Sequence, residues 1–345
     1  MAKARRIKGV DCDGVATAGI RLVLIGRFAE MRKLRSHALN WEDPEGVHSM
    51  RVASRRLRSA LRDFLPYLRK RDLSASSKQI REIADALGDV RDQDVAILAL
   101  EKLDAEAPAE VSSVLNEVIE QRQKARDDAR EKLEKTITRA RLKLLSATFA
   151  EAVEAATAER QQKRPRQQIP PKYLDVASTV ILDRLEEVEQ LSDSLYRPLD
   201  VEPLHDMRIA AKRLRYAIEL FQECWGKDIL IFAEEVAALQ LSLGELHDCD
   251  VWIDSFGKHT IASKKKHQQD QSDAFAWLLN HFIEARNDYL MNALAGWRKW
   301  EAEGLSRKLR DIITGEEPIS EPIDELAQQE PPSQSSTVVT KSTAT

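Results

Sequence analysis

The chain has 345 residues, of which 43% are hydrophobic and 32% charged, and its formal net charge at pH 7 is −4. Glycine and proline are scarce, at 12 residues each, and the abundant Ala, Leu, Glu and Arg favour helix, so the composition predicts an all-α protein with a sizeable core. Because the net charge is small and negative, the total charge alone gives no reason to expect an anionic partner. The argument for such a partner requires charges of one sign gathered on one face.

No apolar run approaches the length needed to cross a bilayer, and the N-terminus lacks the apolar segment of a signal peptide. The three cysteines, Cys12, Cys224 and Cys249, show no CxxC spacing and give no disulfide framework. A reducing compartment is therefore the default, and we expect a soluble, cytoplasmic protein with no membrane partner.

The chain begins with a basic segment, residues 1–17, that we expect to be flexible. A helical pattern follows to about Asn40. Asp43 and Pro44 then predict the cap and the first position of a second helix, which we expect to bend or stop at Pro66.

Beyond that helix, the pattern predicts a helical pair hinged near Gly88 and one long charged helix from about Pro108 to Thr157. The segment after it is basic and rich in proline, and the C-terminal end is too poor in apolar residues to fold alone. We therefore expect a first helical half, a linker, a second helical half and a disordered tail, at residues 18–158, 159–172, 173–312 and 313–345.

The helix expected after Asp43 has cations on one side and apolar residues on the other. Steps of three and four residues place five basic side chains on one face, which are His48, Arg51, Arg55, Arg58 and Arg62. The apolar residues recur about half a turn away and predict a core face, which contains Met50, Ala53, Leu57, Leu61 and Phe64. An ordinary solvated helix mixes acids with bases, so a face of one sign indicates a binding surface.

The same pattern occurs twice. VHSMRVASRRLRSAL, residues 47–61, recurs without a gap as LHDMRIAAKRLRYAI, residues 204–218. The matched basic positions are His48 with His205, Arg51 with Arg208, Arg55 with Lys212, Arg56 with Arg213, and Arg58 with Arg215. We call the basic residues of the first copy the first cationic face and those of the second copy the second cationic face. The chain is therefore a tandem duplication, and we expect the two faces to oppose each other across a groove or channel.

Two further matches support the duplication. LGDVRDQDV from Leu87 corresponds to LGELHDCDV from Leu243, which sets Arg91 opposite His247. LNEVIEQR, which ends at Arg122, corresponds more weakly to LNHFIEAR, which ends at Arg286.

Cations gathered on one face repel one another, and an anion relieves that repulsion. Arginine offers a planar fork of donors that matches phosphate oxygens, so a long phosphate polymer or a nucleic acid fits both faces. Single-stranded nucleic-acid sites normally add aromatic stacking platforms, whereas Tyr216 is the one aromatic residue among these cations. We therefore prefer inorganic polyphosphate as the partner and keep non-specific nucleic-acid binding as the alternative.

A second alternative is a metal-dependent phosphohydrolase. The second half resembles an H…HD…D pattern through His205, His247, Asp248, and Asp250 or Asp254. In the first half Arg91 occupies the corresponding histidine position, and a guanidinium cannot ligate a cation. The acidic residues of both repeats are therefore expected to cap helices or to position arginines; they are Asp89, Asp92, Asp94, Glu245, Asp248 and Asp250. We expect no catalysis, no cofactor and no metal.

VHSMRVASRRLR and LHDMRIAAKRLR, each followed by an LGxxRD or LGxxHD segment, resemble the two signature halves of the CHAD family, the conserved histidine α-helical domain. The resemblance covers roughly residues 18–312. It implies two tandem four-helix bundles related by pseudo-twofold symmetry, with a basic surface and central channel that bind inorganic polyphosphate.

By position, the resemblance implies eight ligand contacts, which are His48, Arg51, Arg55, Arg58, His205, Arg208, Lys212 and Arg215. We expect additional contacts from Arg56, Arg62, Arg91, Arg122, Arg213, His247 and Arg286. Many relatives carry a triphosphate tunnel domain with an ExExK strand, and none is visible in this sequence. We therefore expect a stand-alone, non-catalytic binding module that could be targeted to polyphosphate granules.

Overall fold

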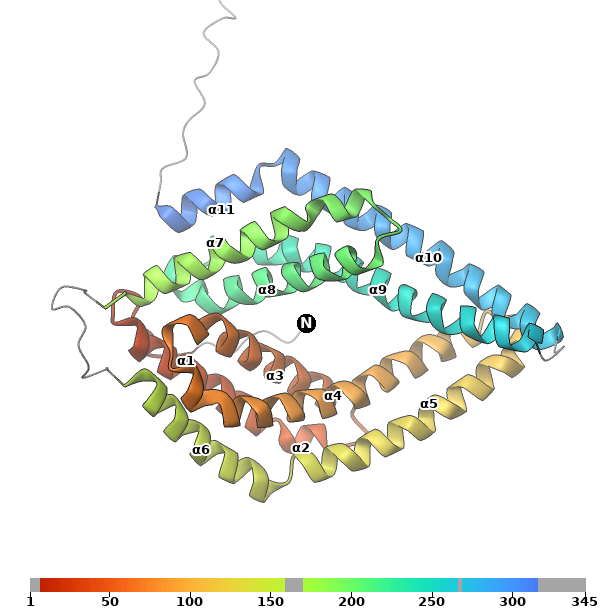
Figure 1. The fold of residues 1–345 in the computed structure, drawn as a ribbon, viewed down its shortest axis with the longest axis horizontal. Helices are drawn as coiled ribbons and strands as arrows, with labels where there is room; N and C mark the ends of the chain where they lie inside the picture. Colours follow the sequence, from red (N-terminus) through yellow and green to blue (C-terminus); the bar gives the residue numbers. More distant parts are fainter. Residues whose placement is uncertain (1–6, 159–169, 266–268, 316–345) are drawn as a thin grey trace, which may run out of the picture.

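The computed structural model describes residues 7–158, 170–265 and 269–315, and the prediction of an all-α fold is confirmed over these residues (Figure 1). The first half contains α1 Ala16–Lys33, α2 Arg35–Ala38, α3 Pro44–Phe64, α4 Lys70–Asp104, α5 Ala109–Thr136 and α6 Arg139–Thr157. The second half contains α7 Tyr173–Leu191, α8 Val201–Trp225, α9 Leu230–Lys265, α10 Gln269–Ala302 and α11 Leu305–Thr314. In the described ranges, no helix is both long enough and apolar enough to span a membrane.

Helix contacts follow the same order in both halves. In the first half α1 packs on α3, α3 on α4 and α4 on α5, and in the second half α7 packs on α8, α8 on α9 and α9 on α10. The halves contact each other through α1 with α7, α3 with α8, and α5 with α10. The two helices that carry the cationic faces, α3 and α8, therefore lie next to each other at the junction of the halves (Figure 1).

The start of α3 is fixed by local chemistry. The Asp43 carboxylate accepts a hydrogen bond from the backbone N–H of Glu45 at 3.0 Å, as the predicted N-cap requires. A Cβ atom at Gly46 would lie 2.0 Å from the carbonyl oxygen of His37, so only glycine permits α2 to approach this first turn. The helix ends just before Pro66, as predicted.

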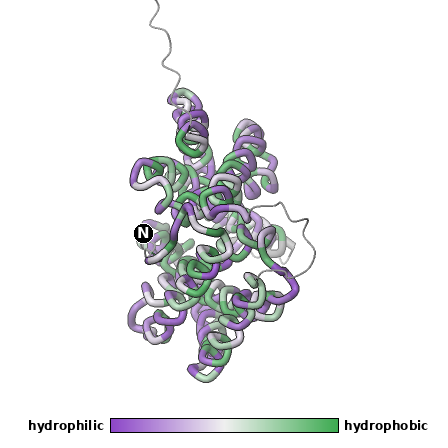
Figure 2. Tube along the Cα trace, turned by 90° about the vertical axis from the view of Figure 1, so that its left-hand side faces the viewer, coloured by the Kyte–Doolittle hydropathy of each residue, from purple (hydrophilic) through white to green (hydrophobic). Residues whose placement is uncertain are grey.

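The predicted apolar faces of α3 and α8 are buried. The α8 residues that correspond to the apolar face of α3 are Met207, Ala210, Leu214, Ile218 and Phe221, and all are fully covered. Phe64 of α3 contacts Phe221 edge to face with ring centroids 5.7 Å apart. Hydrophobic and hydrophilic residues are interspersed along the chain (Figure 2). The two repeats therefore share one main core.

A second, smaller core lies at the far tip of the molecule, where the ends of α4 and α5 meet α9 and α10 (Figure 1). Its aromatic centre consists of Trp252, Phe256, Phe275 and Phe282. The two halves are thus joined by apolar contacts at two separate places.

Two predicted helix boundaries are wrong. The helix α4 passes through Gly88 without a hinge, because Leu87 and Val90 on either side of it are buried in the main core. The single long helix predicted from Pro108 to Thr157 is instead two helices, α5 and α6. Thr138 caps the second of them, since its hydroxyl accepts a hydrogen bond from the backbone N–H of Arg141 at 3.2 Å.

The N-terminal segment differs from the flexible lead-in that the composition predicted. Within residues 7–17, Ile7 and Val10 pack against the main core, and the carbonyl of Cys12 accepts a hydrogen bond from the N–H of Leu174 at 2.9 Å. Cys12 is also disulfide-bonded to Cys224 at the end of α8. This bond contradicts our inference that the cysteines give no disulfide, and it is unusual for a protein in a reducing compartment. Residues 1–6, 159–169 and 316–345, on which the other flexibility predictions fall, lie outside the described residues.

The disulfide gives a first testable prediction. Cys224→Ser is expected to lower the free energy of unfolding by about 2–4 kcal/mol, because the bond closes a long loop in the unfolded chain. Urea denaturation with and without a reductant measures this difference. Cys249→Ala, which alters the unpaired buried cysteine, is the control and should keep the sensitivity to reductant. Equal stability of the reduced and the oxidised wild type would contradict the prediction.

Candidate anion-binding site

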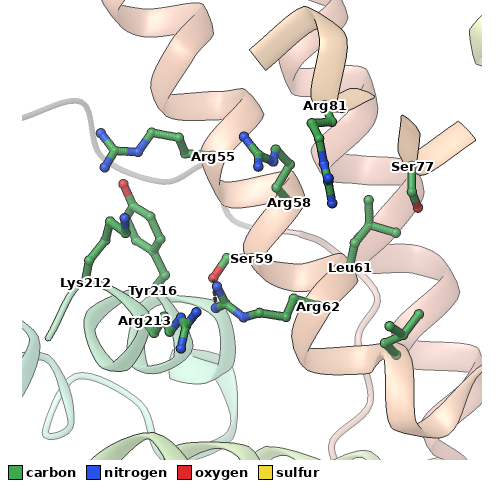
Figure 3. A pocket seen from close by; sticks show the side chains of 11 residues that line it. Arg55, Arg58, Ser59, Leu61, Arg62, Ser77, Arg81, Lys212, Arg213 and Tyr216 are labelled. Carbon is green, nitrogen blue, oxygen red and sulfur yellow. Dashed lines mark hydrogen bonds between the residues drawn. The ribbon is translucent and has the colours of Figure 1, made fainter. Parts of the chain in front are cut away.

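A pocket opens where α3, α4 and α8 meet, with a volume of about 450 Å³ (Figure 3). We call it the cationic pocket, because six of its lining side chains are basic, namely Arg55, Arg58, Arg62, Arg81, Lys212 and Arg213. The other lining residues are Ser59, Leu61, Leu65, Ser77 and Tyr216, so no carboxylate lines it. Basic side chains from both halves therefore converge on one volume.

Three of the six basic side chains lack a partner. Within the part of the chain that the structure describes, Arg55, Arg81 and Lys212 form no hydrogen bond and no ion pair. Arg58 has only a loose ion pair with the exposed carboxylate of Asp85, at 3.6 Å. Their donors are therefore available to an anion.

The remaining two basic side chains are held in place by acids, one buried and one partly buried. Asp63, whose side chain is fully covered, accepts hydrogen bonds from Arg62 and from Arg184 of α7. Arg62 also donates to the hydroxyl of Ser59 at 2.8 Å. Glu187 of α7 holds Arg213 in the same way. The floor of the pocket is therefore fixed before any ligand arrives.

The N-terminal parts of the two cationic faces also lie near each other. Arg51 of α3 donates to Asp92 of α4 at 3.0 Å. Burial lowers the pKa of Arg208 of α8, and the nearby charges that act on this guanidinium include Arg55 and Asp92 of the first half. Arg208 has no ion pair with any described residue. His205 and His247 approach each other with their Nδ1 atoms 3.2 Å apart. The structure thus brings together the predicted residues of both repeats.

The pKa values of one lysine and two histidines of the cationic faces and their surroundings are lowered, which favours their neutral forms. Burial, together with the charges of Arg55 and Arg208, lowers the pKa of Lys212 to about 7. Burial and then Arg208 lower the pKa of His247 to about 4. The pKa of His48 is lowered by burial and by Arg91 of α4. Because like charges and desolvation both oppose protonation, an anion in the site would reverse these shifts.

Five of the predicted contacts line the cationic pocket, namely Arg55, Arg58, Arg62, Lys212 and Arg213, and two of the others are buried. Arg56 and Arg215 are 8% and 6% exposed, and each has an ion pair with Glu219, at 3.4 and 3.2 Å respectively. Glu219 occupies the position in the second repeat that Arg62 occupies in the first. Neither arginine lines the pocket: the ion pair of Arg56 connects α3 to α8, whereas that of Arg215 lies within α8.

Two more predicted residues, Arg122 and Arg286, hold other elements together, and Arg122 does so at the far tip. The guanidinium of Arg122 lies 5.1 Å from the centroid of the Trp252 ring. Arg286 is buried and donates to Asp250 at 2.5 Å and to the carbonyl of Pro198 at 2.8 Å. The weak third sequence match thus marks residues that hold helices together.

Arg81 is the pocket residue that the sequence analysis missed. It lies on α4, one helical turn after Ser77, and outside the segments that the repeat aligned. The corresponding residue of the second half is Ala237, so comparison of the two repeats could not reveal it. The one feature of the sequence that pointed to Arg81 was its four-residue spacing from Ser77, which places both side chains on the same face of a helix.

The two histidines of the H…HD…D pattern lie together, but two of its acids are paired with cations. Asp250 is bound to Arg286, and Asp254 is bound to Lys258 at 2.5 Å. Among the described residues there is no group of three or more His, Cys, Asp or Glu side chains that could hold a metal ion. The geometry therefore favours an anion site over a metal centre.

The chain is similar to a known protein family and to several known proteins. The family model described as the CHAD domain matches residues 23–257. The uncharacterized protein Rv2226 of Mycobacterium tuberculosis (strain H37Rv) is 26% identical over 243 residues, which are 69% of this chain and 45% of that protein. An uncharacterized protein of the strain CDC 1551 matches to the same extent. The chain thus spans about half the length of the curated relatives it matches.

Two solved structures have the same fold. The crystal structure of the CHAD domain from the plant Ricinus communis aligns with a TM-score of 0.63 and 21% identity, over 86% of this chain and 96% of that one. PptA from Streptomyces chartreusis aligns with a TM-score of 0.55 and 15% identity, over 83% of this chain and all of that one.

Proposed function

The chain belongs to the CHAD-domain family, and from that premise we propose that the cationic pocket and the adjoining cationic faces bind inorganic polyphosphate. The observation that carries this proposal is the convergence of six basic side chains from both halves on a pocket without a carboxylate. Since three of them lack any partner, a polyanion would gain charge-assisted hydrogen bonds without first breaking internal ion pairs.

The chemistry of the lining favours a bare phosphate chain over a nucleic acid. Tyr216 is the one aromatic residue that lines the pocket, and it is only 7% exposed. Its ring is covered by the guanidinium of Arg215, 5.0 Å from the ring centroid. Binding of single strands usually requires exposed rings on which bases stack, and this ring offers no such face.

We propose a binding role rather than catalysis. The pocket lining supplies hydrogen-bond donors and positive charge, which are the groups that bind a polyanion. Association with polyphosphate granules in the cytoplasm would follow from such a role.

A salt titration tests the electrostatic basis of the proposal. The affinity for long-chain polyphosphate is expected to fall by about 10³-fold between 50 and 200 mM salt, as for other sites that contact six or more phosphates. Fluorescence anisotropy with end-labelled polyphosphate measures the slope. A nearly flat salt dependence would contradict binding through the cationic pocket.

A competition experiment separates the two polyanions. At fixed salt, unlabelled long-chain polyphosphate is expected to displace the labelled polymer at a much lower phosphate concentration than duplex DNA does. Equal displacement by DNA would instead indicate a non-specific nucleic-acid binder.

A further inference from the structure

The sequence predicts that a ligand must be long in order to touch both repeats, and the pocket geometry removes that requirement. Arg55, Arg58 and Arg62 enter the pocket from α3, and Lys212 and Arg213 enter it from α8 (Figure 3). The charges of Arg55 and Arg62 both lower the pKa of Lys212, so these groups of the two halves lie close together. A short anion can therefore contact both halves at once.

The pocket is also a single site, although the fold is a duplication. At the positions equivalent to Arg62 and Arg81, the second half has Glu219 and Ala237. Glu219 forms ion pairs with Arg56 and Arg215. Arg215 is the second half's equivalent of Arg58, and it is buried in this ion pair instead of lying at the surface. A second copy of the pocket therefore cannot form.

The size and the rigidity of the pocket suit a compact ligand. Its volume of about 450 Å³ lies within the range of pockets that enclose small molecules. Asp63 and Ser59 fix Arg62, and Glu187 fixes Arg213, so little side-chain entropy is lost when an anion binds.

We propose that the cationic pocket is a self-contained site for a short linear oligophosphate of the tripolyphosphate class, bound in a 1:1 complex. A long polymer would place one stretch in this pocket and continue along the cationic faces. The inference rests on the proposed function for its phosphate chemistry, and it adds that a ligand too short to follow the two faces still binds.

Isothermal titration calorimetry of the full chain with sodium tripolyphosphate tests the inference. We expect one site per chain and displacement of tripolyphosphate by long-chain polyphosphate. Arg62→Glu and Arg81→Ala, which install the residues of the second half, should each weaken tripolyphosphate binding by about tenfold or more, because each removes a charge-assisted contact. Both should weaken binding of the long polymer less, since that ligand keeps its other contacts. Arg71→Ala, on the exposed side of α4, is the matched control and should change neither affinity.

The same triphosphate group also occurs in nucleotides, so ATP forms a second arm of the experiment. We expect ATP to bind more weakly than tripolyphosphate, because the Tyr216 ring is covered and offers the base no stacking partner. Tighter binding of ATP would overturn the assignment to an inorganic chain.

The outcomes separate this inference from the proposed function. If long polyphosphate binds and tripolyphosphate does not, or if Arg62→Glu and Arg81→Ala leave tripolyphosphate binding unchanged, the short-ligand site is overturned and the proposed function stands. If the wild type binds neither ligand, both are overturned. Circular dichroism and thermal denaturation of each variant show whether a loss of binding comes from a loss of fold.

Discussion

Reversing two unpaired cations, with Arg55→Glu and Arg208→Glu in one chain, is expected to lower the affinity for long-chain polyphosphate by about 10²- to 10⁴-fold. Neither arginine has an ion pair within the described residues, and they lie on opposite helices of the α3 and α8 contact. A hydrogen bond to a charged group contributes about 1.5–3 kcal/mol, and about 1.4 kcal/mol corresponds to a factor of ten. Two lost contacts therefore account for the expected range, and the new carboxylates add repulsion of the phosphates.

The loss should not result from unfolding. Arg55 and Arg208 both oppose the charge on Lys212, so replacing them with acids removes repulsion between like charges at the junction of the halves. An acid at position 208 gains repulsion from Asp92 and Asp248, which offsets part of this relief, so we expect the double variant to stay folded with a thermal stability close to that of the wild type.

The matched control carries the same change in net charge away from the site. Arg71→Glu together with Arg307→Glu alters exposed arginines of α4 and α11 and should leave the affinity within a few-fold of the wild type. If the Arg55 and Arg208 variant binds as tightly as this control, the ligand binds elsewhere on the protein.

Local sequence signals predicted the elements that carry the site. The apolar residues of α3 and α8, the cap at Asp43 and the repeat itself are encoded within single helices, where the spacing of residues along the chain determines which side chains share a face. These features could therefore be predicted before any tertiary contact was known.

Features that depend on contacts between the halves could not be predicted in this way. Arg55 and Arg56 are neighbours in sequence, yet one lines the pocket and the other is buried against Glu219, because packing with the second half determines how each face is covered. The disulfide joins Cys12 to Cys224 across 212 residues of chain, and no spacing rule predicts such a pair. The contribution of each predicted residue therefore depends on the fold as well as on its charge.

The second large effect concerns pH and depends on Lys212. Its pKa is lowered to about 7 in the free protein, from an ordinary value of 10.5, by burial and by Arg55, Arg208, Arg62 and Arg213. A bound polyanion favours the charged amine and raises this pKa, so binding above pH 7 requires the uptake of a proton. The affinity is therefore expected to fall by about tenfold or more as the pH rises from 7 to 9. The histidines do not contribute in this window, because the pKa values of His48, His205 and His247 are all lowered.

Calorimetry in two buffers of different ionisation enthalpy measures the proton uptake directly. The ligand is long-chain polyphosphate, because it has few terminal phosphates that could themselves take up or release protons. Lys212→Arg is the conservative control, because a guanidinium in this position stays charged across the whole range. This variant should bind with a flatter pH profile and should exceed the wild type in affinity at pH 9. A profile of the same slope in the wild type and in Lys212→Arg would show that another group takes up the proton. A flat profile in the wild type would show that the ligand does not reach Lys212, and it would remove the pocket from the binding surface.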